Sequence, residues 1–164
     1  MSKPETRYYT AVHKLLPPLS ELHREKMHNI YRGGTADVWY SGKLDDLWVE
    51  YKWLAALPKK APVCLDKLLS PLQQQWLTGR HEEGRNIVVI LGTPEGAWVF
   101  EGASWKEPLN PDAIRTDGLT KRKVAEYIKK RTCLNDVLAN PRYTGDQSDL
   151  SSIADNDDDS LPAT

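Results

Sequence analysis

The strongest strand signal in this sequence is the stretch Asp46-Leu-Trp-Val-Glu-Tyr-Lys-Trp53. Trp, Tyr and Val suit a pleated, half-buried surface, and successive side chains of a strand point to opposite faces. One face then carries the apolar residues Leu47, Val49, Tyr51 and Trp53, and we expect it to be a core face. The other face carries Trp48, Glu50 and Lys52, which places a carboxylate beside an ammonium group.

A second strand signal, Asp37-Val-Trp-Tyr-Ser41, precedes this stretch and is joined to it by the loop 42–45. A hairpin is the economical interpretation. If Ser41 lies opposite Asp46, then Asp37 lies opposite Glu50, and like charges in directly opposed positions repel. A divalent cation between the two carboxylates would turn that repulsion into coordination. A slip of one residue in the pairing would turn Asp37 to the other face.

The remaining pattern predicts alternating helices and strands. Helices are expected over 2–16, where Ser2 and Glu5 have capping-box spacing, over 70–84 with Pro71 at its first position, and over 120–131. Further strands are expected at 24–28, at 86–91 as a buried central strand, and at 97–101. This order predicts an α/β sandwich around a small mixed sheet.

The charges of the chain are divided unevenly. Of its 164 residues, 146–164 hold six acids and no Lys or Arg, and we expect a disordered acidic tail there. The expected domain at 1–145 then holds 17 acids and 22 Lys and Arg, a formal charge of about +5. A basic domain favours a polyanionic partner.

Several protein classes are excluded by composition. The longest unbroken aliphatic run, 87–91, is far too short for a membrane span, and the N-terminus lacks the apolar stretch of a signal peptide. Two cysteines, Cys64 and Cys133, form neither a disulfide framework nor a metal knuckle. We therefore expect a soluble cytoplasmic protein, in the host cytoplasm if the chain is viral.

Gly34-Thr-Ala-Asp37 followed by Glu50-Tyr-Lys52 resembles the motif of the PD-(D/E)XK nuclease superfamily. Within it, the chain is similar to small phage and bacterial endonucleases of the VRR-NUC or Holliday-junction-resolvase type. The resemblance covers about residues 5–101, and Ala36 departs from the Pro that usually precedes the Asp. It implies a restriction-endonuclease-like core with an N-terminal helix, an acidic hairpin, a helix bearing a Gln, and a further strand.

This resemblance implies a DNA endonuclease that depends on Mg²⁺, with Mn²⁺ as a substitute. It assigns the metal positions to Asp37 and Glu50 and the catalytic lysine to Lys52. Gln73 falls where related nucleases carry a helix glutamine near the site, and Glu5 is either a further metal ligand or a helix cap. From the chemistry of phosphodiesters, the carbonyl of Tyr51 is another candidate oxygen ligand, and a bound metal would activate water.

Basic clusters before, after and far downstream of this motif favour contacts with phosphate, although isolated charge runs are usually solvated faces. The residues assigned to nucleic-acid contacts are Lys26, Arg32, Gln73, Arg80, Lys121, Arg122 and Lys123. Trp48, on the face of Glu50, is either a core residue or a surface that stacks on a base. We expect His13 to be a surface or packing residue.

Other interpretations remain open. Glu50 and Lys52 would form a simple ion pair if the strand had a solvated face. The chain would then be a non-catalytic nucleic-acid-binding module on a nuclease scaffold. A third alternative is a protein-interaction factor whose acidic tail mimics DNA. A resolvase of branched DNA would act as a two-fold homodimer, because two strands must be cut symmetrically.

Overall fold

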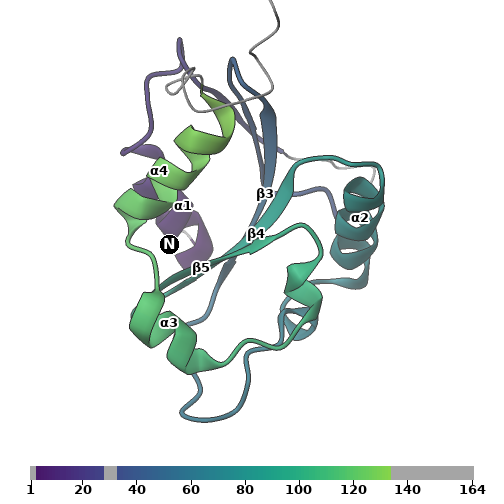
Figure 1. The fold of residues 1–164 in the computed structure, drawn as a ribbon, viewed down its shortest axis with the longest axis vertical. Helices are drawn as coiled ribbons and strands as arrows, with labels where there is room; N and C mark the ends of the chain where they lie inside the picture. The colour runs from purple at the N-terminus through teal and green to yellow at the C-terminus, as the bar shows by residue number, and fades with distance from the viewer. Residues whose placement is uncertain (1–2, 28–32, 134–164) are drawn as a thin grey trace, which may run out of the picture. The chain divides into compact units, whose positions relative to one another are not determined.

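A five-stranded mixed sheet lies at the centre of the computed structural model, which describes residues 3–27 and 33–133 (Figure 1). The strands follow one another across the sheet in chain order, and only β3 and β4 pair in parallel. Their bounds are β1 His23–Lys26, β2 Val38–Ser41, β3 Asp46–Trp53, β4 Ile87–Thr93 and β5 Gly96–Glu101. The expected α/β fold with a small mixed sheet is confirmed.

The hairpin of β2 and β3 has the register that the sequence predicts. Ser41 pairs with Asp46 and Val38 pairs with Val49. Continued by one residue, this register brings Asp37 opposite Glu50. On the other side of β3, the parallel partner β4 is buried along its whole length, as expected for a central strand.

Helices cover both faces of the sheet (Figure 1). The helices α1 (Pro4–His13) and α4 (Lys121–Thr132) pack on the face that carries Val49 and Tyr51. On the opposite face, α2 (Pro71–Glu82) packs against β4 and contributes Leu77 to a second apolar cluster, against which Trp48 lies. The expected core face of β3 is confirmed, because Leu47, Val49 and Tyr51 are fully buried. The face of Glu50 is covered as well, which the sequence does not predict.

The start of α2 is fixed by a reciprocal cap. The Ser70 hydroxyl accepts a hydrogen bond from the Gln73 backbone N–H at 3.2 Å, and the Gln73 side-chain oxygen accepts one from the Ser70 N–H at 3.0 Å. Pro71 occupies the first helical position. This cap engages the side-chain oxygen of Gln73 and leaves its amide NH₂ free to point elsewhere.

Helix α1 is shorter than the expected 2–16. Leu15 and Leu16 donate backbone hydrogen bonds to residues three positions earlier, Val12 and His13, so the last turn tightens before the two prolines that follow. Lys3 is the N-cap residue and makes no side-chain cap bond, and Ser2 lies outside the described residues. The strands at 24–28, 86–91 and 97–101 and the helix at 120–131 are confirmed to within two residues at each end.

Three short elements have no counterpart among the expectations: α3 (Pro111–Asp117) and the 3-10 turns η1 (Leu65–Lys67) and η2 (Ser104–Lys106). Helix α3 has only seven residues, too few to show a helical period. Its local signal is Asn110, whose side chain caps the N–H of Asp112 at 3.0 Å, followed by Pro111. In the described parts of the chain, no helix has the length and apolarity needed to cross a membrane. The expected tail at 146–164 lies outside them.

Candidate active site

Glu50 lies in the middle of β3, and its side chain is 0% exposed. Its oxygen Oε1 accepts hydrogen bonds from two donors, the Lys52 Nζ at 2.6 Å and the Gln73 amide from the first turn of α2. Its other oxygen, Oε2, is buried and has no hydrogen-bond partner among the described residues. Leaving a buried carboxylate oxygen bare is costly, so this atom marks a place where a cation fits.

The pKa of Glu50 also indicates a cation beside this carboxylate. The pKa of Glu50 is raised to about 8, because burial and the Asp37 carboxylate raise it by more than the neighbouring Lys52 ammonium lowers it. One lysine therefore does not fully compensate the two carboxylates. A divalent cation supplies the missing positive charge.

Asp37 precedes β2 by one residue and is held against β3. Its oxygen Oδ2 accepts the backbone N–H of Tyr51 at 2.9 Å. Burial raises the pKa of Asp37, and this N–H and the Lys52 charge lower it. Because the N–H and C=O of one strand residue point to the same neighbour, the Tyr51 carbonyl also faces the side of Asp37. The Asp37 carboxylate and the Tyr51 carbonyl thus lie at one edge of β3, close enough to Glu50 for the Asp37 charge to raise the pKa of Glu50.

The loop before Asp37 lies directly against the start of α2. Gly34 has a φ of +96°, and a Cβ atom on it would lie 2.4 Å from the backbone oxygen of Leu72. Only glycine permits both this conformation and this approach. The contact sets the spacing between the loop that ends at Asp37 and the helix turn that carries Gln73.

The first turn of α1 and the end of β1 bring further charges to this edge. Burial raises the pKa of Glu5, the Lys52 charge lowers it, and the Asp37 charge raises it, so its carboxyl lies within electrostatic range of both. A hydrogen bond with Tyr9 raises the pKa of Lys26, to which the Asp37 and Glu5 charges add. The sequence analysis missed Lys3, whose charge lowers the pKa of both Glu5 and Asp37.

These residues fit a magnesium ion. Mg²⁺ is bound through one or two carboxylates and keeps its other positions for water and substrate phosphate oxygens. Asp37 and Glu50, with the Tyr51 carbonyl, supply that set. Between residues 3 and 27 and between 33 and 133, no three His, Cys, Asp or Glu side chains gather as ligands of one metal ion. Glu5 is thus a neighbouring charge in this conformation, and its role as a metal ligand stays a prediction.

The residues assigned to nucleic-acid contacts lie in several places. Lys26 lies near the carboxylates, and Gln73 is bound to Glu50. At the start of α4, Lys121 places its Nζ 6.0 Å from the ring centroid of Tyr8, which ties it to α1. The next two residues, Arg122 and Lys123, are exposed, Arg80 forms an exposed ion pair with Glu83 at 2.8 Å, and Arg32 lies outside the described residues.

Behind the site, a chain of side-chain hydrogen bonds connects α1 to the hairpin. The His13 ring nitrogen Nε2 lies 2.7 Å from the Tyr40 hydroxyl, which lies 2.7 Å from the Tyr51 hydroxyl. His13 is therefore a packing residue, one of the two roles expected for it. These three side chains hold the strand segment whose backbone binds Asp37.

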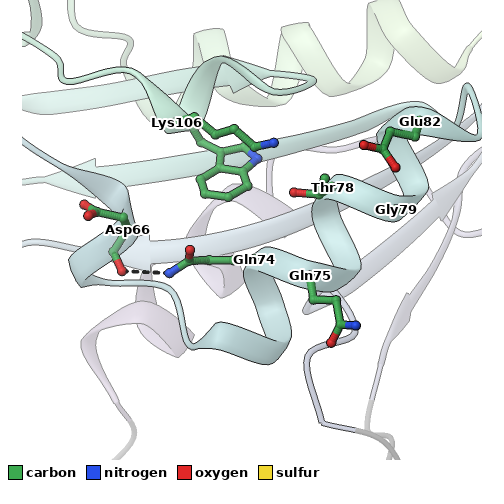
Figure 2. Close-up of a pocket in the computed structure, with 8 residues that line it drawn as sticks. Asp66, Gln74, Gln75, Thr78, Gly79, Glu82 and Lys106 are labelled. Atoms are coloured by element: carbon green, nitrogen blue, oxygen red, sulfur yellow. Dashed lines mark hydrogen bonds between the residues drawn. The ribbon is translucent and has the colours of Figure 1, made fainter.

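A pocket on the surface of α2 lies apart from these residues (Figure 2). It is bounded by α2 and the turns η1 and η2, and Gln74 donates a hydrogen bond to the Asp66 carbonyl at 2.9 Å across it. None of Asp37, Glu50 and Lys52 lines it. It carries two carboxylates, Asp66 and Glu82, against one ammonium, Lys106, so its charge does not favour phosphate.

The chain matches no protein-family model, and its sequence is not significantly similar to any curated protein. Among solved structures it is similar to Hjc, a Holliday junction resolvase from the archaeal hyperthermophile Archaeoglobus fulgidus. The TM-score is 0.46 and the identity 14%, and the match covers 76% of this chain and 97% of that chain. A similarity of this size assigns neither an activity nor a substrate to this chain.

Proposed function

We propose that this chain is a metal-dependent endonuclease that hydrolyses DNA phosphodiester bonds with an activated water molecule. The observation that carries the proposal is the arrangement of Glu50. Lys52 and Gln73 hold one of its oxygens, while the other is buried and has no partner among the described residues, and the Asp37 charge acts on the same carboxyl group. A carboxylate used only for stability would have partners on both oxygens.

The roles follow from this arrangement. Asp37, Glu50 and the Tyr51 carbonyl would hold the ion. When bound, Mg²⁺ lowers the pKa of a water ligand and neutralises the charge that develops on the phosphate. Gln73 keeps the Glu50 carboxylate in one orientation through its amide. Lys52, whose side chain is 13% exposed, presents its ammonium to the attacking water or to the pentacovalent phosphate.

Lysines around the carboxylates supply binding energy for the DNA backbone. Lys3 and Lys26 interact electrostatically with Asp37 and Glu5, and Lys121 lies over Tyr8 at the neighbouring helix start. Such contacts release counterions, so we expect DNA affinity to fall as salt rises. They also offset the repulsion between the phosphate and the carboxylates.

Cleavage of supercoiled plasmid and of a synthetic four-way junction, in Mg²⁺ or Mn²⁺ against EDTA, tests this function. We expect metal-dependent cutting, and the preferred substrate shows whether branched DNA is recognised. If neither DNA is cut while salt-sensitive binding persists, the chain is a non-catalytic binding module on a nuclease scaffold. If the protein binds neither DNA, the proposal fails entirely.

A further inference from the structure

The face of β3 that carries Glu50 continues into a groove lined by tryptophans. This tryptophan groove lies between the start of β3 and the second half of α2, and its lining includes Thr35, Trp48, Trp76, Arg80 and Arg85. It adjoins the candidate active site, because Thr35 precedes Asp37 by two residues and Trp48 precedes Glu50 by two. Two residues of a strand span about 7 Å, so the groove begins about two base-stacking steps from Glu50.

Three indole rings form a row along this face. The rings of Trp48 and Trp76 meet edge to face, with centroids 5.6 Å apart and an interplanar angle of 62°. On the other side, Trp39 of β2 pairs directly with Trp48, and the two rings stack with centroids 5.8 Å apart and 20° between their planes. All three are only partly buried. Partly exposed indoles beside a phosphodiester site offer an aromatic surface to flat ligands.

The charges of the groove suit bases better than phosphates. Its two guanidinium groups, Arg80 and Arg85, are balanced by two carboxylates, Asp45 and Asp46. Base edges present both donors and acceptors, so a balanced lining can meet them, whereas phosphates favour the lysines gathered around Glu5 and Asp37. Aromatic stacking is the usual way in which proteins hold unpaired bases.

From this geometry we infer that the tryptophan groove holds unpaired bases of the strand that is cut at Asp37 and Glu50. The substrate is then DNA with a single-stranded segment next to the cut. The inference rests on the proposed function for its choice of nucleic acid. Binding by the groove needs no metal, however, so the two can be tested apart.

Fluorescence anisotropy in EDTA measures this binding on the full chain. The probes are a fluorescein-labelled short duplex with blunt ends, the same duplex with a thymidine tail, and the same duplex with an abasic tail of equal length. We expect the thymidine tail to bind about tenfold more tightly than the abasic tail, because stacking on a protein aromatic favours each base by about that factor or more. We also expect only the thymidine tail to quench tryptophan fluorescence of the wild-type protein.

Three variants test whether the preference for the thymidine tail comes from the tryptophan groove. Trp76→Leu should bring the affinity for the thymidine tail down to that for the abasic tail. The matched control Trp98→Leu changes a half-buried tryptophan of β5 that does not line the groove, and it should keep the preference. Arg85 is exposed, so Arg85→Ala tests the groove without disturbing the core, and it should also reduce the preference.

Equal affinity of the wild type for the two tails would overturn the inference, whatever the plasmid assay shows. Loss of the preference in Trp98→Leu as well as in Trp76→Leu would also overturn it, because the effect would then not belong to the groove. A preference for the thymidine tail in a protein that cuts no DNA would overturn the proposed nuclease function, while the binding of unpaired bases by the groove would stand.

Discussion

At the scale of single residues, Glu50 determines what the fold can do. It is a fully buried carboxylate with two donors on one oxygen and none on the other among the described residues. Such a group is a poor source of stability, because removing a charge from water costs more than one imperfect ion pair returns. A cation at Oε2 removes that cost. The same atom therefore explains both the unusual burial and the proposed chemistry.

His13 gives a prediction on pH at the same scale. Burial and, to a smaller extent, the Arg24 charge together lower the pKa of His13 from 6.5 to about 4. As the pH falls, the unfolded chain thus binds a proton on His13 at a higher pH than the folded chain does. The stability contributed by neutral His13 is therefore complete above pH 6.5 and is lost as the pH falls from 6.5 to about 4. We expect the advantage of the wild type over His13→Gln to shrink by about 1 kcal/mol between neutral pH and the lower pKa, after allowance for partial exposure.

Urea unfolding followed by tryptophan fluorescence measures this difference. Comparing the two proteins at each pH cancels the contributions of the acidic groups that both share. A difference in the free energy of unfolding that stays constant with pH would show that His13 is not held neutral by the fold.

At the scale of elements, the contact between the Asp37 loop and α2 holds the candidate site together. Gly34 lies against the backbone of Leu72, and the capping box at Ser70 fixes the helix turn that carries Gln73. One side of this contact orients Asp37, and the other orients Glu50 through Gln73. A small displacement of α2 would therefore change both carboxylates at once.

Gly34→Ala tests this contact. We expect it to destabilise the protein by about 2–4 kcal/mol, because alanine is strained at a positive φ and its Cβ would collide with the Leu72 carbonyl. It should also reduce DNA cleavage. Gly79→Ala is the matched control within α2: nothing lies within 4 Å of the added Cβ, so we expect a gain of about 0.5–1 kcal/mol. Urea unfolding measures both, and a Gly34→Ala protein as stable as the wild type would contradict the account.

The elements show which parts of the fold are predictable from the sequence. The alternation in β3 and the four-residue loop before it define the hairpin and its register, because a strand period of two residues and a short turn leave few alternatives. The start of α2 is equally local, since Ser70, Pro71 and Gln73 carry its cap. The helix α3 was not predicted, because seven residues show no helical period and only Asn110 and Pro111 signal the start of a helix.

At the scale of the whole molecule, prediction fails where distant segments meet. The burial of Glu50 depends on α2 covering a face of β3 that looks polar in the sequence. The position of Lys3 near the carboxylates depends on how α1 packs against the sheet, and the tryptophan groove depends on how α2 does. Sequence periodicity assigns a residue to a face but does not say what covers that face. The pairing of Asp37 with Glu50 was predictable because both belong to one hairpin.

The most direct test of the central claim compares the cleavage of supercoiled plasmid by the wild type and by Glu50→Gln in Mg²⁺. Glutamine keeps the size and hydrogen bonds of the side chain but removes the charge that holds a metal ion. Glu95→Gln is the matched control, because Glu95 is an exposed turn residue paired with Arg115. We expect the wild type and Glu95→Gln to cut the plasmid and Glu50→Gln to bind it without cutting. Cleavage by Glu50→Gln at the wild-type rate would contradict the assignment of Glu50 as the metal-binding carboxylate.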